Sequence, residues 1–199
     1  MRIIAGELKG RRLKTNPGMT TRPLLDRVKQ MLFDRIEADL GEAHVLDIFA
    51  GTGNLGFEAL SRGASTCVFI EQDRKAHQLL KENTAHLGIE DRVLCWRTDA
   101  LSCSYRPKGV ESFFPFDVVF FDPPYPLVES MTGPNNPLQK ALARLASDEV
   151  TAAEIALLIV RLPKRGSIEV PPIWVKTEFE IVEASMRIQF YEKHTDLED

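Results

Sequence analysis

Apolar residues along this chain alternate between short continuous runs and runs in which they recur every three or four positions. The continuous runs predict five buried strands, at residues 44–48, 67–70, 92–95, 117–121 and 155–160. The helical spacing predicts helices over residues 25–36, 54–62, 73–87 and 138–145. Strands that alternate with helices indicate an α/β fold, in which a mostly parallel sheet carries helices on both faces.

The two ends of the chain depart from this alternation. Residues 179–183 and 187–191 predict two strands joined by a connection that is too short for a parallel crossover, so we expect an antiparallel hairpin at the C-terminus. Residues 1–14 predict a small β-hairpin that turns at Gly10, followed by a linker over residues 15–21.

The composition is typical of one globular domain. The chain has 199 residues, of which 44% are hydrophobic, enough for one sizeable core. Its longest apolar run, residues 155–160, is far shorter than the roughly 20 residues of a membrane helix, and the first residues lack the apolar stretch of a secretory signal. The three cysteines and four histidines lack the spacing of a disulfide framework or a metal site. We expect a cytoplasmic protein with reduced thiols and no bound metal.

Charge is distributed unevenly along the chain. Residues 1–30 hold eight basic and two acidic residues, although the whole chain has a net charge of −4. This split is typical of a protein that binds phosphates through one segment while its bulk stays acidic. We therefore divide the chain into a basic hairpin and linker, residues 1–22, and a main α/β domain, residues 23–199.

A glycine-rich loop follows the first predicted strand. Gly51, Gly53 and Gly56 satisfy the G-x-G-x-x-G pattern of nucleotide-binding loops, and Glu71 lies at the end of the next strand. Glycines allow a sharp turn and a close approach of the backbone to a ligand, and a carboxylate at that strand end can accept both hydroxyls of a ribose. The pattern predicts a nucleoside-binding site.

Asp47, near the end of the first strand, bears on which nucleoside binds. Its carboxylate would repel a pyrophosphate and attract the amino or sulfonium end of S-adenosylmethionine. Asp99 and Ala100 follow the third strand, where a short polar group could accept a hydrogen bond from an adenine amine. The candidate cofactor-binding residues are Asp47, Phe49, Gly51, Gly53, Glu71, Asp99 and Ala100.

The sequence Asp122-Pro123-Pro124-Tyr125 ends the fourth strand, at the edge where open α/β sheets bind ligands. Its prolines restrict the backbone and make a stiff bracket. The Asp122 carboxylate and the Pro123 carbonyl could each accept an N–H from a nucleobase amine and hold its lone pair toward a methyl donor. Tyr125 could stack on a flipped base. We predict methylation of an exocyclic amine, with Asp122, Pro123 and Tyr125 as catalytic residues.

The order of glycine loop, acidic second strand and Asp-Pro-Pro-Tyr resembles that of the class I S-adenosylmethionine-dependent amino-methyltransferases, which have a Rossmann-like sheet. Residues 2–6, 9–11, 21–23, 26–29 and 32–33 narrow the resemblance to the bacterial 16S ribosomal RNA guanine-N2 methyltransferases. The resemblance implies S-adenosylmethionine as the cofactor and the N2 amine of one guanine in 16S ribosomal RNA as the methyl acceptor. It also implies that the basic segment helps to hold RNA. The candidate RNA-binding residues are Arg11, Arg12, Arg22 and Arg27.

The resemblance leaves open whether bare RNA or an assembling small ribosomal subunit is the substrate, and we expect the protein to be a monomer. Three places differ from the usual pattern of the family. Leu24-Leu25 stand where threonine or serine usually follows Arg-Pro, Arg161 stands where the fifth strand often ends near a glutamate, and Ala184-Ser185-Met186 replace a glycine-containing turn. We expect these differences to leave the proposed chemistry untouched.

Three other functions remain open. An N6-adenine methyltransferase of DNA or RNA would use the same bracket, and nucleoside analysis of the product separates the two amines. A nicotinamide-dependent oxidoreductase would use the glycine pattern but would leave the Asp-Pro-Pro-Tyr sequence without a role, and titration with each cofactor decides. A non-catalytic RNA-binding protein could retain the pocket, but it would keep its function when Asp122 is replaced by alanine.

Overall fold

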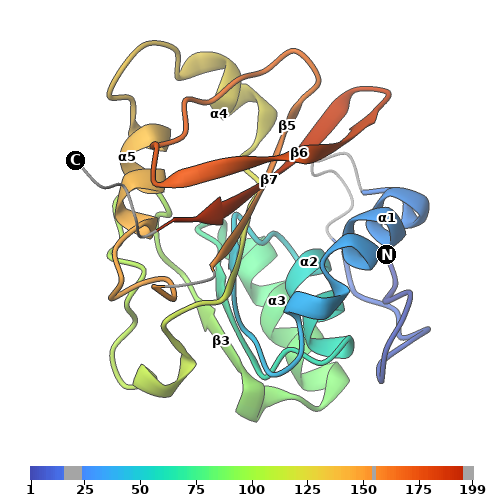
Figure 1. Cartoon of the computed structure of the whole chain (residues 1–199). Helices are drawn as coiled ribbons and strands as arrows, with labels where there is room; N and C mark the ends of the chain where they lie inside the picture. The colour runs from blue at the N-terminus through green and yellow to red at the C-terminus, as the bar shows by residue number, and fades with distance from the viewer. Residues whose placement is uncertain (16–23, 154–155, 195–199) are drawn as a thin grey trace.

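A seven-stranded sheet forms the centre of the computed structural model, which describes residues 1–15, 24–153 and 156–194 (Figure 1). The strand order is β3-β2-β1-β4-β5-β7-β6. β1 to β5 pair in parallel, and β7 pairs antiparallel with both β5 and β6. The predicted α/β class, with a mostly parallel sheet and an antiparallel C-terminal pair, is therefore confirmed. The strands are β1 His44–Ile48, β2 Thr66–Ile70, β3 Val93–Trp96, β4 Val118–Phe121, β5 Leu157–Pro163, β6 Trp174–Glu183 and β7 Met186–Lys193.

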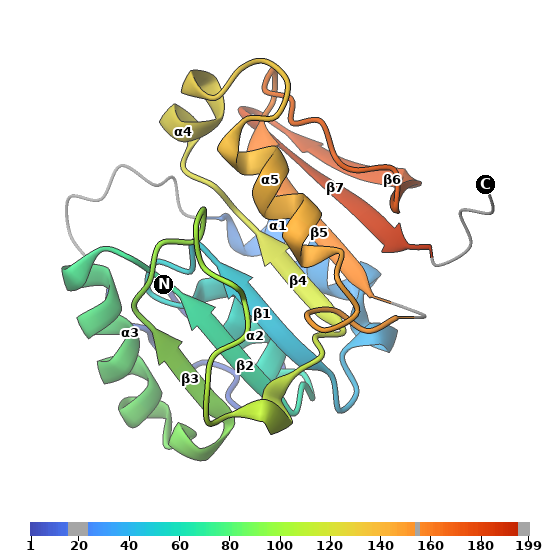
Figure 2. The same cartoon turned by 90° about the vertical axis from the view of Figure 1, so that its left-hand side faces the viewer.

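Helices cover both faces of this sheet (Figure 2). On β4, Val118 and Phe120 belong to one hydrophobic cluster with α1, α2 and α3, whereas Val119 and Phe121 belong to a second cluster with α4 and α5. Burial of both faces explains why β4 is apolar throughout. The α-helices are α1 Asp26–Arg35, α2 Asn54–Ser61, α3 Arg74–Leu87, α4 Tyr125–Ser130 and α5 Pro137–Leu145, and the 3-10 helices are η1 Glu37–Asp39, η2 Glu90–Arg92 and η3 Glu111–Phe113. None of the helices in the described ranges is long and apolar enough to span a membrane.

The end of β5 differs from the expected boundary. The strand runs from Leu157 to Pro163 instead of residues 155–160. Antiparallel pairing with β7 causes the extension, because this pairing aligns Arg161 with Ile188 beyond the last residue of β4. Arg161 therefore lies within a strand, directly beside the end of β4.

The predicted N-terminal hairpin is present in a minimal form. An antiparallel bridge between Arg2 and Arg12 connects its two arms, and the amides of Ile3, Gly10 and Leu13 donate to carbonyls of the opposite arm. The hairpin packs against the main sheet domain, since Ile3 and Leu13 are buried in the first hydrophobic cluster. The predicted linker, residues 15–21, lies outside the described residues except for its first position.

The Glu58 carboxylate, on α2, holds this hairpin against the sheet domain. It accepts hydrogen bonds of 3.0 Å from the backbone amides of Ile4 and Ala5, which therefore pair with a side chain and not with the opposite arm. Glu58 also forms ion pairs with Lys29, at 2.9 Å, and with Arg62, at 3.0 Å. Its side chain is fully buried. One buried carboxylate thus joins the N-terminal segment, α1 and α2.

Candidate active site

A cavity of about 1530 Å³ opens at the edge of the sheet where β1, β2, β4 and β5 end. Parallel strands all end at the same edge, so the loops that follow them come together there (Figure 2). The predicted cofactor residues that line this cavity are Asp47, Phe49, Gly51, Glu71 and Ala100. The predicted catalytic residues Asp122, Pro123 and Tyr125 line it as well. The two predicted halves of the site therefore border one space.

The turn after β1 places Gly51 at the cavity. Gly51 has a φ of +58°, and a Cβ atom built on it would have no neighbouring heavy atom within 4 Å. Phe49, which also has a positive φ of 63°, packs edge-on against Phe121 with ring centroids 5.5 Å apart. The left-handed backbone and the open space at Gly51 leave room for a ligand against the main chain.

The other two glycines of the motif serve packing. A Cβ atom on Gly53 would lie 2.3 Å from the ring of Phe57, and one on Gly56 would lie 2.3 Å from the ring of Phe69. Gly53 is the N-cap of α2 with a φ of +89°. It does not belong to the described cavity lining, although we predicted it as a cofactor-binding residue. Position 53 requires a glycine because the start of α2 has a positive φ there and because the core leaves no room for a Cβ atom.

Asp47 lies under the glycine turn and is 2% exposed. Its Oδ2 accepts a hydrogen bond of 2.9 Å from the backbone amide of Gly56, in the first turn of α2. A pyrophosphate would need such amides at the helix N-terminus, so this bond disfavours the dinucleotide alternative. Burial raises the pKa of Asp47 to about 8, with Asp122 and Glu71 adding to the rise. A cationic group in the cavity would favour its ionised form.

Glu71 follows β2 and is held by two backbone amides. Its Oε2 accepts from Gly51 at 2.8 Å, and its Oε1 accepts from Asp73 at 2.7 Å. Burial raises the pKa of the carboxyl group, while these two bonds oppose the rise. Each oxygen keeps a further lone pair, so the carboxylate remains able to accept hydrogen bonds from a ribose in a fixed position.

Asp99, in contrast, uses its side chain within a turn. Its Oδ1 accepts from the backbone amide of Leu101 at 2.9 Å, and its Oδ2 accepts from the Ser102 hydroxyl at 3.1 Å. The carboxylate is not part of the described lining of the cavity, whereas the neighbouring residues Thr98 and Ala100 are. The structure thus gives the Asp99 side chain a turn-capping role, and its contact with an adenine amine stays a prediction.

The Asp-Pro-Pro-Tyr bracket continues directly into α4, a helix that the sequence pattern did not predict. Pro124 is the N-cap of α4, and Pro126 lies in its first turn, where the missing N–H is tolerated. Tyr125 is half-buried, lines the cavity and packs against the first hydrophobic cluster. Its ring is therefore held in place by the core on one side.

Arg161 is a site residue that the sequence analysis missed. The pairing of Phe121 with Val160 places the next residues of β4 and β5, Asp122 and Arg161, side by side. The Arg161 Nε lies 2.8 Å from Asp122 Oδ1, and the two side chains are 11% and 18% exposed. Burial raises the pKa of Asp122 and Arg161 lowers it. The structure thus brings Arg161, which we expected to leave the chemistry untouched, into an ion pair with the predicted catalytic carboxylate.

The predicted RNA-binding residues Arg11, Arg12 and Arg27 lie outside the described cavity lining. Arg11 and Arg12 are exposed, and the Arg11 guanidinium donates to the backbone carbonyl of His86. Arg27 forms an ion pair with Glu183 at 2.5 Å. Arg22 lies outside the described residues. The N-terminal segment nevertheless reaches the cavity, which Met1 and Thr15 help to line.

Lys164 and Arg165 are two further basic residues that the sequence analysis missed. Both are exposed and line the cavity just beyond β5. A signal existed in the sequence, since basic residues directly after a predicted parallel strand belong to the ligand-binding edge.

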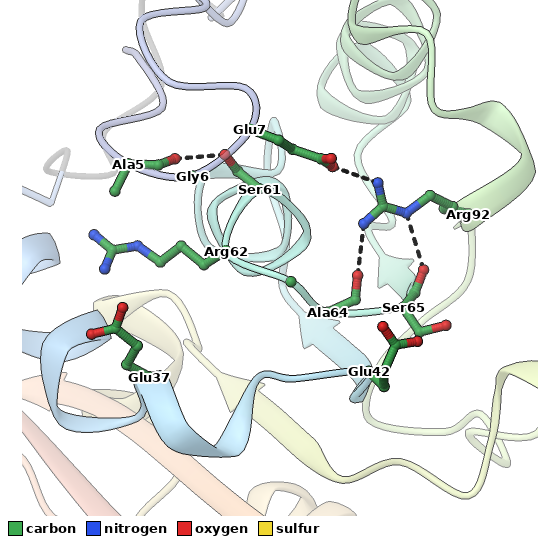
Figure 3. A pocket seen from close by; sticks show the side chains of 11 residues that line it. Ala5, Gly6, Glu7, Glu37, Glu42, Ser61, Arg62, Ala64, Ser65 and Arg92 are labelled. Carbon is green, nitrogen blue, oxygen red and sulfur yellow. Dashed lines mark hydrogen bonds and ion pairs between the residues drawn. The ribbon is translucent and has the colours of Figure 1, made fainter.

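A second hollow, of about 630 Å³, lies near the opposite ends of β1 and β2 (Figure 3). The Arg92 guanidinium donates there to the carbonyls of Leu60, Ala64 and Ser65, and it pairs with Glu7. These contacts satisfy backbone groups at the start of the strands. The residues of this hollow therefore stabilise the starts of the strands, whereas the predicted cofactor-binding and catalytic residues line the larger cavity.

Comparison with known proteins gives consistent results. Residues 1–190 match the family model described as "Conserved hypothetical protein 95". The chain is 30% identical over 172 residues to "Ribosomal RNA small subunit methyltransferase D" of Buchnera aphidicola subsp. Acyrthosiphon pisum, which covers 86% of this chain and 83% of that protein. It is 40% identical over 126 residues to the Escherichia coli K12 protein of the same name, a match to 63% of this chain and 60% of that protein.

Solved structures agree with these matches. The Escherichia coli protein yhhF superposes with a TM-score of 0.77 at 32% identity, covering 98% of this chain and 99% of that chain. An RNA methyltransferase from Salinibacter ruber, in complex with S-adenosyl-L-homocysteine, has a TM-score of 0.61 at 15% identity and covers 89% of this chain and 98% of that chain. At 15% identity, the similarity to the Salinibacter ruber structure shows a shared fold alone.

Proposed function

The chain belongs to the family described as "Conserved hypothetical protein 95", and on that premise we propose that it methylates the exocyclic N2 amine of a guanine in 16S ribosomal RNA, with S-adenosylmethionine as the methyl donor. The observation that carries the proposal is the shared cavity. Asp47 and Glu71 border it on one side and the Asp122 bracket on the other. A nucleoside cofactor and a nucleobase can therefore meet inside it.

The residues on the first side fit this cofactor. The open backbone at Gly51 accommodates a nucleoside, and Glu71, fixed by two amides, accepts hydrogen bonds from its ribose. Asp47 places a carboxylate below the turn for the cationic end. When bound, S-adenosylmethionine supplies an electrophilic methyl group attached to its sulfonium sulfur. Transfer of that methyl group leaves the cofactor as a neutral thioether.

The bracket residues orient the amine. The Asp122 carboxylate and the Pro123 carbonyl each accept one N–H, so that the nitrogen directs its lone pair toward the cofactor side of the cavity. Tyr125, held by the core, offers the edge or face of its ring to the base. One proton leaves the amine for each methyl group that it gains, and the negative charge of Asp122 stabilises the positive charge that develops on nitrogen.

The basic N-terminal segment supplies contacts to RNA phosphates in this proposal. Arg11 and Arg12 are exposed on a segment whose ends border the cavity. Arg27 would exchange its ion pair with Glu183 for a phosphate, and Arg22 completes the set. We extend the proposal to a monomeric, cytoplasmic protein whose residues 1–22 contact RNA and whose substrate is 16S RNA, either bare or within an assembling small subunit.

Methyl transfer from labelled S-adenosylmethionine to unmodified 16S RNA, bare and loaded with ribosomal proteins, tests this function. We expect incorporation, with N2-methylguanosine as the product after nucleoside digestion, and no incorporation with the Asp122→Ala variant. N6-methyladenosine as the product would overturn the choice of base. Tight binding of NAD without binding of S-adenosylmethionine would overturn the reaction.

A further inference from the structure

Arg161 and Asp122 meet at the wall of the cavity, not in the core. Both residues line the cavity. They occupy adjacent positions on β5 and at the end of β4, with Arg161 Nε 2.8 Å from Asp122 Oδ1. A partly buried ion pair of this kind is weak evidence for stability, because desolvation offsets most of the attraction. Its place beside the predicted reaction centre points to a functional role.

We propose that Arg161 is a positioning residue for the methyl transfer, which fixes Oδ1 of Asp122, keeps that carboxylate charged and leaves Oδ2 to accept an N–H of the incoming amine. The inference rests on the proposed function of the same site. A charged carboxylate matters because a protonated one would offer an O–H donor toward the amine, which is itself a donor. Fixing one oxygen also restricts rotation of the carboxylate, so that the acceptor position is set before the base arrives.

The charges around Asp122 explain why Arg161 would keep it ionised. Most of the other charged side chains in the cavity lining are acidic: Asp47 from β1, Glu71 and Asp73 after β2, and Glu129 from α4. Lys164 and Arg165 are exposed and lie beyond the end of β5.

Arg161 is the basic residue that reaches the carboxylate, and it also lowers the pKa of Asp47. Burial raises the pKa of Asp122 and Arg161 opposes this effect, so removal of Arg161 should raise the pKa of Asp122 further. An opposite charge at this distance typically lowers the pKa of a carboxyl group by about 1–3 units.

The test compares Arg161→Met and Arg161→Lys with a matched control, Arg165→Met. The control removes one positive charge from the same cavity lining, but from an exposed position. Two measurements are made on each full-length variant: the pH dependence of kcat for methyl transfer to 16S RNA, with KM for RNA and cofactor, and the titration of the Asp122 carboxyl carbon by NMR in the cofactor-free protein.

We expect Arg161→Met to shift the acid limb of the kcat profile to higher pH by about 1–3 units, with little change in the KM for cofactor. Arg161→Lys should retain part of the effect, and it also serves if the methionine variant fails to fold. Arg165→Met should affect the KM for RNA and leave the acid limb in place. An unchanged acid limb and an unchanged Asp122 titration in the Arg161 variants would overturn the inference.

Absence of methyl transfer by the wild-type protein would overturn the proposed function instead. In that case the role in methyl transfer fails with the proposed function, and the NMR titration still tests whether Arg161 keeps Asp122 charged: a higher Asp122 pKa in Arg161→Met than in the wild type supports this effect, and equal values refute it.

Discussion

Replacement of Glu58 by glutamine removes the charge that joins the N-terminal segment to the sheet domain. The carboxylate is fully buried, and it pairs with Lys29 and Arg62, whose side chains are 1% and 5% exposed. Glutamine keeps the size of the side chain but leaves the buried Lys29 without its counter-ion, and Arg62 keeps only its longer ion pair with Asp34, at 3.5 Å. Removal of one partner from a buried ion pair costs about 3–5 kcal/mol.

That loss is large against the total stability of a domain, which is about 5–15 kcal/mol. For a chain of this length it corresponds to a fall in Tm of roughly 6–20 °C. Urea unfolding of Glu58→Gln measures the loss, with Glu82→Gln as the matched control. Glu82 pairs with Lys14 of the same N-terminal segment at 2.9 Å, but at the surface. Exposed pairs contribute about 0–1 kcal/mol, so the control should remain close to the wild type.

Hydrogen exchange adds a local test. The amides of Ile4 and Ala5 donate to Glu58, so we expect their exchange to accelerate in Glu58→Gln more than that of amides in the central strands. The further replacement Lys29→Met should recover part of the stability, because it removes the buried charge that has lost its counter-ion. A loss below about 1 kcal/mol, equal to that of the control, would refute the reasoning that this carboxylate docks the segment.

Three further predictions concern the cavity and the basic segment. Gly56→Ala should lower the free energy of unfolding by about 1–3 kcal/mol, since its Cβ would lie 2.3 Å from a phenylalanine ring of β2. Gly51→Ala meets no neighbouring atom but has a φ of +58°, so it should cost about 1–2 kcal/mol and also weaken cofactor binding in calorimetry; an unchanged cofactor affinity would contradict this. Asp47 has a pKa of about 8 in the folded protein and an ordinary value of 3.8, so the folded state binds the extra proton and the stability of the cofactor-free protein should fall as pH rises from about 4 to about 8. Asp47→Asn should remove that fall in urea titrations at several pH values, and an unchanged slope would count against the raised pKa. The double variant Arg11→Glu and Arg12→Glu should weaken RNA binding and flatten its salt dependence while cofactor affinity stays constant; unaltered RNA affinity would exclude these arginines as phosphate contacts.

The sequence left three features of the structure unpredicted, each for its own reason. The start of α4 was missed because two consecutive prolines indicate a stop, although a proline is well tolerated in the first turn of a helix. The N-terminal hairpin was predicted but its docking on α2 was not, because the Glu58 carboxylate that accepts its amides is far away in the sequence. The Asp99 side chain caps its own turn, as short acidic side chains often do, and its contact with an adenine amine stays a prediction.

The sequence alone determined the sheet and the position of the candidate site. Hydrophobic periodicity depends on local geometry, so β4 and α3 could be predicted from neighbouring residues, and the rule that parallel strands end at one edge placed Asp47, Glu71 and Asp122 together. Only the tertiary structure decided which charges meet at that edge and beneath the N-terminal segment. The pairing of Arg161 with Asp122 depends on strand register, and the contacts of Glu58 depend on how a helix packs over a distant segment. Such contacts between residues far apart in the chain follow from packing as a whole, which leaves no periodic trace in the sequence.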